Sequence, residues 1–248
     1  SSTDKVLVLQ NGAYSKRMVE MCDYHGIKYV VYEEDFAHVP DPAIVEDVLK
    51  SDGNITHISM VHSETTSGLL NDIAAIGELA KKYNKKFIVD AMSSFGGVDI
   101  NVPELGITYL VSSANKCIQG VPGFSFIIAK VSDLKETKGI ARSLSLDLYA
   151  QWETMEKDGG KWRFTSPTHV VAAFSQALKE LAAEGGITAR NARYTSTNRA
   201  LRKGMEELGF KAYIDEAHQG PIITTFFYPE NCKFTFAKMY AYLKDHGY

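Results

Sequence analysis

The sequence predicts an α/β protein with a mostly parallel sheet that is covered by helices on both faces. Apolar runs of strand length alternate with helical segments as far as residue 129, and this alternation is typical of parallel sheets built from strand–helix–strand units. The polar residues Thr65, Asp90 and Lys116 each fall at or just past the end of a predicted strand. Functional groups in such sheets gather beyond the carboxyl ends of the strands, so we expect the site at this edge.

The elements of the sheet follow from the apolar runs and from residues that begin or end helices. Gly26 ends the first helix, as glycine commonly does. Asp41 and Pro42 suit the N-cap and the first position of the second helix. The predicted strands span residues 5–9, 28–32, 57–61, 86–90, 109–112 and 123–129, and the predicted helices span residues 16–25, 42–49 and 71–83.

The second half of the chain follows a different pattern. Residues 131–165 are less regular, and a segment of this length is expected to be functional or packed against a partner subunit. Helices are predicted at 168–184, 188–208 and 235–246, and strands at 211–214 and 221–228. We therefore expect two domains: a large α/β domain over residues 1–167, which carries the strand-end residues Thr65, Asp90 and Lys116, and a bridging helix with a small, incomplete α+β domain over residues 168–248.

Composition excludes several functional classes. Hydrophobic residues make up 45% and charged residues 23% of the 248 residues, as in ordinary globular proteins. The net charge of −3 gives no support to nucleic-acid binding, and the longest apolar runs are too short for a transmembrane helix. The seven histidines lack the spacing of metal ligands. Neither G-x-G-x-x-G nor a P-loop pattern occurs in the sequence, which disfavours a nucleotide-binding domain.

The three cysteines, Cys22, Cys117 and Cys232, are scattered along the chain and odd in number. This pattern fits a reducing compartment and argues against a disulfide framework, so we expect a cytoplasmic protein. The sequence does not begin with methionine, and we expect it to be part of a longer chain.

The stretch from Phe87 to Phe126 contains the two residues that indicate chemistry. Asp90 ends the apolar run 87–89, and Lys116 lies among small and polar residues after the next predicted strand. A pyridoxal phosphate enzyme needs such a pair, because the lysine forms an imine with the cofactor and the carboxylate keeps the pyridine nitrogen protonated. Two simpler explanations stay open: Lys116 as an exposed surface residue, and Asp90 as the cap of the next element.

Thr65 lies in a polar segment, residues 62–68, that follows another predicted strand. Its hydroxyl either bonds to the backbone of a turn, as threonine hydroxyls commonly do, or bonds to the phenolic oxygen of the cofactor. Both explanations stay open on the local sequence alone.

Five runs of sequence carry a resemblance to a known family. They span residues 62–68 (HSETTSG), 89–97 (VDAMSSFGG), 112–124 (SSANKCIQGVPGF), 141–149 (ARSLSLDLY) and 162–169 (WRFTSPTH). In this order they resemble the 2-aminoethylphosphonate:pyruvate aminotransferases, which belong to the class V, fold-type I aminotransferases. The resemblance covers essentially the whole chain and implies pyridoxal 5'-phosphate as the cofactor.

The resemblance implies cofactor contacts for several residues. Lys116 is implied as the Schiff-base lysine, and Asp90 as the partner of the pyridine nitrogen. Thr65 matches the position that bonds to the phenolic oxygen, and Asn115 matches a position near the cofactor phosphate.

Three further positions are implied around the ring and the phosphate. Tyr14 matches the residue that stacks on the ring, and Met92 the residue that packs against its other face, although both also suit an ordinary core. Thr165, with Trp162 nearby, resembles the segment that reaches the phosphate of the neighbouring subunit's cofactor. The resemblance therefore implies a homodimer with shared active sites.

The activity that the resemblance implies is amino transfer from 2-aminoethylphosphonate to pyruvate, which gives phosphonoacetaldehyde and L-alanine. One alternative is another class V aminotransferase or lyase that acts on a small amino acid, such as alanine or serine with glyoxylate. A remote alternative is a non-catalytic α/β binding domain. Two features of the family have no counterpart in this sequence: a Gly/Ser/Thr-rich phosphate cup and a C-terminal arginine that holds the substrate acid. We therefore expect the chain to correspond to the middle of such an enzyme.

Overall fold

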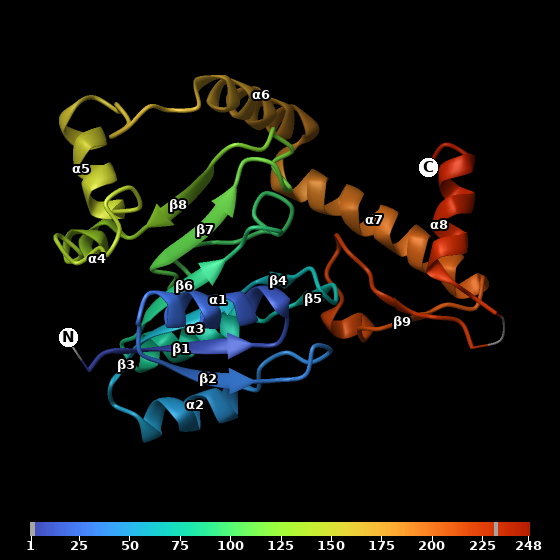
Figure 1. The fold of residues 1–248 in the computed structure, drawn as a ribbon, viewed down its shortest axis with the longest axis horizontal. Helices are drawn as coiled ribbons and strands as arrows, with labels where there is room; N and C mark the ends of the chain where they lie inside the picture. Colours follow the sequence, from blue (N-terminus) through green and yellow to red (C-terminus); the bar gives the residue numbers. More distant parts are fainter. Residues whose placement is uncertain (1–2, 231–232) are drawn as a thin grey trace.

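The computed structural model describes residues 3–230 and 233–248 and contains a six-stranded main sheet (Figure 1). The strands of this sheet are β1 (Lys5–Gln10), β2 (Tyr29–Glu33), β3 (Ile55–Val61), β6 (Lys86–Asp90), β7 (Tyr109–Ser113) and β8 (Ser125–Ala129). Their order is β2-β1-β3-β6-β7-β8. Neighbouring strands are parallel except for β7 and β8, which are antiparallel. The prediction of a mostly parallel sheet is confirmed.

The first three helices connect the parallel strands: α1 (Ala13–Tyr24), α2 (Pro42–Ser51) and α3 (Ile73–Lys82). Asp41 caps α2 as predicted, because its Oδ1 accepts a hydrogen bond of 2.8 Å from the Ala43 N. Asp72 caps α3 in the same way, with bonds of 3.0 Å from the Ala74 and Ala75 N atoms. The cap places the start of α3 slightly later than predicted.

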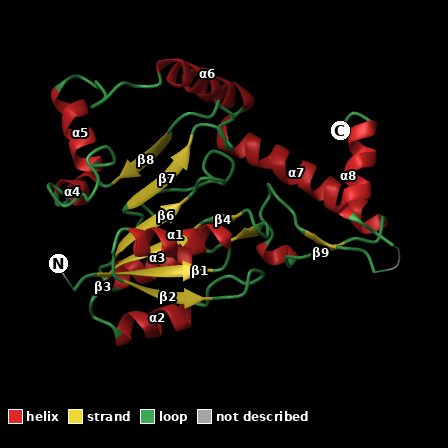
Figure 2. Cartoon of the chain, viewed as in Figure 1, coloured by secondary structure: helices red, strands yellow, loops and turns green. Residues whose placement is uncertain are grey.

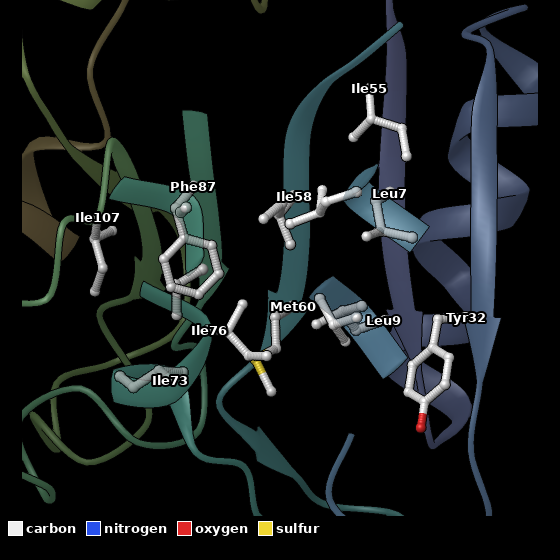
Figure 3. Close-up of a cluster of buried hydrophobic side chains, with 14 of the residues drawn as sticks. Leu7, Leu9, Tyr32, Ile55, Ile58, Met60, Ile73, Ile76, Phe87 and Ile107 are labelled. Carbon is white, nitrogen blue, oxygen red and sulfur yellow. The ribbon is translucent and has the colours of Figure 1, made fainter. Parts of the chain in front are cut away.

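The main hydrophobic core lies between the sheet and the pair α2 and α3. Figure 3 shows Leu7 and Leu9 of β1 close to Ile58 and Met60 of β3, with Ile76 of α3 packed against them. All five side chains are almost completely buried. Burial of large aliphatic side chains stabilises the fold by about 1.5–3 kcal/mol each. This core makes the central strands a rigid support for the loops that follow them.

The other face of the sheet is covered as well. Successive side chains of a strand point to opposite faces, so Ser59 points away from the core that contains Ile58 and Met60. The Ser59 hydroxyl lies 3.2 Å from the Met18 Sδ of α1. Helix α1 therefore packs on the opposite face from α2 and α3, which confirms the predicted helices on both faces.

Residues 62–70 form a small hairpin, and its turn, residues 65–68, lies within the predicted polar turn 62–68. Strand β4 (Ser63–Glu64) pairs with β5 (Leu69–Leu70) in an antiparallel sheet of two strands. The Gly68 N donates to the Glu64 carbonyl oxygen at 2.8 Å, and Gly68 takes a positive φ of 90°, a conformation that glycine adopts without strain. The hairpin continues directly from β3 and carries Thr65 and Thr66.

The second half of the chain contains more regular structure than predicted. The irregular segment 131–165 includes α4 (Val131–Lys135) and α5 (Leu148–Lys157). Asp147 begins α5 by accepting a bond of 3.0 Å from the Ala150 N, a cap that the sequence prediction overlooked. Two long helices follow, α6 (Thr168–Glu184) and α7 (Gly186–Glu207), and Gly185 ends α6 in the left-handed conformation.

Helix α7 leads away from the main sheet to the last elements of the chain (Figure 2). These are β9 (Lys211–Ala212), the short 3-10 helix η1 (Glu216–His218), β10 (Phe226–Phe227) and α8 (Phe236–Asp245). The two strands pair antiparallel and are shorter than predicted. The division into domains at residues 167 and 168 stays a prediction.

Two predictions concern the chain as a whole. Cys22 and Cys117 are free and buried, whereas Cys232 lies outside the described residues. In the part of the chain that the structure describes, no helix is long and apolar enough to cross a membrane.

Candidate active site

The strand-end residues that the sequence analysis singled out lie at one edge of the sheet: Asp90 ends β6, Tyr14 belongs to the first turn of α1, and the others lie in the loops after the strands. Tyr14 follows β1, Thr65 follows β3, Asp90 and Met92 lie at or after the end of β6, and Asn115 and Lys116 follow β7. These four strands are parallel neighbours in the sheet. Their carboxyl ends therefore meet at the same edge, as expected from the sequence.

Asp90 is positioned by the two strands beside it. It is paired with Val61 of β3 and Val111 of β7, and its Oδ1 accepts a hydrogen bond of 2.9 Å from the Met92 N. Burial raises the pKa of the Asp90 carboxyl above its ordinary value, the bond from Met92 partly offsets this, and the charge of Glu64 adds to the rise. Among the described residues, no cation forms an ion pair with this carboxylate.

His62 lies beside Asp90 and contacts both its backbone and the side chain of Ser94. The His62 backbone N donates to the Asp90 carbonyl oxygen at 2.8 Å, and its Nδ1 lies 2.9 Å from the Ser94 Oγ. Burial lowers the pKa of His62 to about 4, although the charge of Asp72 opposes the shift. The imidazole is therefore neutral near pH 7. Its place at the start of the run 62–68 was a signal that the sequence analysis did not use.

Glu64 is a second residue that the sequence analysis missed. Its carboxylate is completely buried and accepts bonds of 2.8 Å from both the N and the Oγ of Ser15, at the start of α1. The positive end of a helix dipole favours a carboxylate at this place. A Cβ at Gly12 would overlap the Glu64 carboxylate, which explains why a residue without a side chain precedes α1. Glu64 thus joins the hairpin that carries Thr65 to the start of α1, which carries Tyr14.

Lys116 and Asn115 lie in the turn that follows β7, and both are exposed. The Lys116 ammonium forms no hydrogen bond or ion pair with any residue in the ranges 3–230 and 233–248. The Asn115 Oδ1 accepts a bond of 3.1 Å from the Ser113 Oγ. The exposure of Lys116 agrees with the simpler explanation of a surface residue as well as with a lysine that is available for a covalent bond to a ligand.

Tyr14 and Thr65 present side chains that can meet a ligand. Tyr14 is 39% exposed, and the guanidinium carbon of Arg17 lies 5.1 Å from the centre of its ring. Thr65 is partly exposed, whereas the hydroxyl of its neighbour Thr66 accepts a bond of 3.1 Å from the Ala13 N, at the start of α1. Among the described residues, the Thr65 hydroxyl makes no hydrogen bond to the backbone of the turn, so it is available to a ligand.

Thr165 is the one predicted site residue from another part of the chain. It is exposed and lies in the segment between α5 and α6, which passes on the β8 side of the sheet (Figure 1). Within the described residues, no hydrogen bond joins it to the strand-end loops. Nearby, the ring of Trp162 packs against Phe124 at a centroid distance of 6.0 Å. The role of Thr165 toward a neighbouring subunit stays a prediction.

This set of groups fits pyridoxal phosphate at its ring nitrogen and its aldehyde. A protonated ring nitrogen would supply the cation and the second hydrogen-bond donor that the Asp90 carboxylate lacks. Lys116, in the turn after the neighbouring strand β7, offers a primary amine that is free of ion pairs in the described structure. No group of three or more His, Cys, Asp or Glu side chains suited to a metal ion occurs among the described residues.

The fold and this edge define a class of protein. The sequence profile described as "Aminotransferase class-V" matches residues 1–245, and the chain belongs to this family. Its fold is the fold-type I arrangement that the sequence predicts.

Particular relatives are named for one reaction. The chain is 55% identical, over 98% of its length, to the 2-aminoethylphosphonate--pyruvate transaminase of Klebsiella pneumoniae, of which it covers 66%. It is also 55% identical over its whole length to a Clostridioides difficile protein named "Bifunctional phosphonoacetaldehyde hydrolase/aminoethylphosphonate transaminase", of which it covers 39%. The chain thus spans about two thirds of the curated transaminases that it matches.

Solved structures of the same fold act as further comparisons. The alanine--glyoxylate aminotransferase of Nostoc sp. superimposes with a TM-score of 0.87 at 21% identity, over 98% of this chain and 64% of that one. The pyridoxamine-pyruvate aminotransferase of Mesorhizobium loti gives a TM-score of 0.85 at 27% identity, over 94% of this chain and 60% of that one. The first likeness shows the fold alone.

Proposed function

We propose that the protein transfers the amino group of 2-aminoethylphosphonate to pyruvate and so forms phosphonoacetaldehyde and L-alanine. The observation that carries the choice of substrates is the identity of 54–55%, over nearly the whole chain, to proteins named for this reaction. The name of the Clostridioides difficile relative adds support. That name assigns a phosphonoacetaldehyde hydrolase and the transaminase to one chain. Phosphonoacetaldehyde is the product of the proposed amino transfer, so the hydrolase would consume what the transaminase forms.

The chemistry rests on the pair at the strand ends. Bound pyridoxal phosphate supplies an electron sink that stabilises negative charge on the substrate carbon. Asp90 accepts a hydrogen bond from the ring nitrogen and holds its proton there, since a buried carboxylate gains most from a cationic partner. Lys116 would hold the aldehyde of the cofactor through its Nζ, and the same Nζ, once free, would take the proton from the substrate carbon that bears the amino group.

The surrounding residues orient the ring in this proposal. Tyr14 and Met92 pack against its two faces, and Thr65 donates its hydroxyl to the phenolic oxygen. Asn115 lies near the phosphate. Thr165 reaches the phosphate of the cofactor in a neighbouring subunit, so we propose a homodimer with shared active sites, located in the cytoplasm.

The full-length protein, loaded with pyridoxal phosphate, tests the choice of substrates. We expect kcat/KM for the formation of L-alanine from 2-aminoethylphosphonate and pyruvate to exceed, by at least about 100-fold, kcat/KM for the formation of glycine from glyoxylate with alanine or serine as donor. A reversed preference would overturn the phosphonate proposal in favour of the small-amino-acid alternative. A protein that binds no cofactor and transfers no amino group would overturn both.

The same protein tests the role of Lys116. Borohydride fixes the cofactor to the lysine that binds it, and mass spectrometry of the peptides identifies that lysine. We expect the label on Lys116, and no label in the Lys116→Ala variant. A matched control is Lys130→Ala, which changes an exposed lysine after β8 and should leave the labelling unchanged. Persistent labelling of the Lys116→Ala variant would refute the assignment.

A further inference from the structure

A buried arginine on α7, Arg190, donates hydrogen bonds to the turn that carries Lys116. The side chain of Arg190 is only 2% exposed. Its Nη1 donates to the carbonyl oxygens of Cys117, at 2.7 Å, and Ile118, at 3.2 Å. These are the two residues that directly follow Lys116, so the contact lies within the turn itself.

The other side of the guanidinium is held by a carboxylate. Nε and Nη2 of Arg190 donate to the Glu184 Oε2 at 2.8 and 2.6 Å. Arg193 donates to the same carboxylate from the outside, with Nε at 2.8 Å from Oε1. The two guanidinium groups, Arg193 first and then Arg190, lower the pKa of Glu184 to about 2. The carboxylate is therefore charged near pH 7. The Arg190 guanidinium is held by this carboxylate on one side and by the two backbone carbonyls on the other.

The same face of α7 holds the neighbouring loop. The Asn191 Nδ2 donates to the Gly97 carbonyl oxygen at 2.7 Å, in the loop that follows Asp90. The Tyr194 hydroxyl accepts a bond of 2.8 Å from the Gln119 Nε2. One helix thus contacts the loops after both β6 and β7.

The turn at Lys116 needs such support. The Gln119 N donates to the Lys116 carbonyl oxygen at 2.8 Å, and the Gly120 N donates to the Ala114 carbonyl oxygen at 2.9 Å. Gln119 adopts a positive φ of 64°, a left-handed conformation that is uncommon for residues other than glycine. The carbonyls of Cys117 and Ile118 lie inside this tight turn, and without Arg190 they would be buried without their donor.

We propose that Arg190 is a positioning residue: by fixing the backbone at Cys117 and Ile118, it holds Lys116 in the geometry that the transfer of the amino group requires. This inference rests on the proposed function, in which Lys116 binds the cofactor and moves the proton. Displacement of a catalytic group by about 1 Å can cost about 100-fold in rate. A planar guanidinium suits the task, since it bonds in fixed directions to a carboxylate and to carbonyls at once.

The test compares Arg190→Gln with Arg193→Gln in the full-length protein. Arg193 is the matched control, because it bonds to the same Glu184 but is 47% exposed and touches neither carbonyl. In the cofactor-free protein, we expect Arg190→Gln to speed hydrogen exchange of residues 114–120 by at least about 10-fold. In the loaded enzyme, we expect kcat to fall by at least about 10-fold, while KM for 2-aminoethylphosphonate stays within about threefold.

Two additional measurements separate positioning from general stability. The pH midpoint of the cofactor's long-wavelength absorbance should shift in Arg190→Gln and stay unchanged in Arg193→Gln. Arg190→Lys keeps the charge but not the planar fork, so we expect an intermediate kcat; this variant also replaces Arg190→Gln if the latter fails to fold. The role of Arg190 would be overturned if Arg190→Gln and Arg193→Gln had equal hydrogen-exchange rates at residues 114–120, equal pH midpoints of the absorbance and equal kcat. Failure of the unaltered protein to bind cofactor at Lys116 would instead overturn the proposed function, and with it this role.

Discussion

The carboxylate of Glu64 accepts two hydrogen bonds of 2.8 Å from Ser15, one from its backbone N and one from its hydroxyl. Glu64 belongs to the hairpin after β3, whereas Ser15 begins the helix after β1. The contact therefore joins the hairpin after β3 to the first turn of α1, at the functional edge. It also means that the positions of Thr65 and Tyr14 depend on one buried carboxylate.

We expect Glu64→Ala to lower the free energy of unfolding by about 2–4 kcal/mol, because it leaves buried donors at the start of α1 without an acceptor. Thermal or urea unfolding of the cofactor-free protein measures this loss. Glu78→Ala is the control, since Glu78 is exposed and pairs only with Lys81 within the described structure; its loss should stay below about 1 kcal/mol. Equal losses in the two variants would show that the Glu64 contact contributes little.

Glycines on two helices should respond to the same substitution with opposite signs. A Cβ at Gly77 of α3 would overlap the carbonyl oxygen of Leu105, whereas a Cβ at Gly204 of α7 meets nothing within 4 Å. Helix propensity alone favours alanine over glycine by about 1 kcal/mol at either position. We therefore expect Gly204→Ala to stabilise by up to about 1 kcal/mol and Gly77→Ala to destabilise by about 1–3 kcal/mol. A gain in melting temperature for Gly77→Ala would contradict the close packing of α3.

Local sequence patterns predicted the main sheet and its helices but not the contacts between distant parts of the chain. Apolar runs and capping residues such as Asp41 predicted the sheet and its helices, because they reflect local preferences of the backbone. The strand-end position of Asp90 and Lys116 was predictable for the same reason. The contacts of Glu64 with Ser15 and of Arg190 with Cys117 were not, since each joins residues far apart in the chain and no local pattern encodes such pairs.

The buried His62 should make stability depend on pH. Burial lowers its pKa in the folded protein to about 4, whereas the unfolded chain binds the proton near the ordinary value of about 6.5. The folded state therefore loses stability as the pH falls from about 6.5 toward 4, by up to about 3 kcal/mol. Urea unfolding at a series of pH values measures this slope.

The variant His62→Gln isolates that contribution, because the amide does not titrate and can still bond to the Ser94 hydroxyl. His57, whose pKa is also lowered by burial, adds a slope of the same sign in both proteins. We expect the difference in unfolding free energy between the unaltered protein and His62→Gln to shrink as the pH falls below 6.5. A difference that is constant from pH 7 to 4.5 would show that His62 titrates normally.

Replacement of Asp90 should separate stability from activity. The Asp90→Asn side chain can still accept the bond from the Met92 N but carries no buried charge. Since burial raises the pKa of the Asp90 carboxyl, the charge costs stability in the cofactor-free protein, and we expect the melting temperature of Asp90→Asn to be unchanged or higher at pH 7. The amide does not hold the ring nitrogen protonated, so we expect kcat to fall by about 100-fold or more. Asp99→Asn makes the same chemical change at an exposed position nearby and should alter neither quantity. Near-normal turnover of Asp90→Asn would mean that another group serves the ring nitrogen.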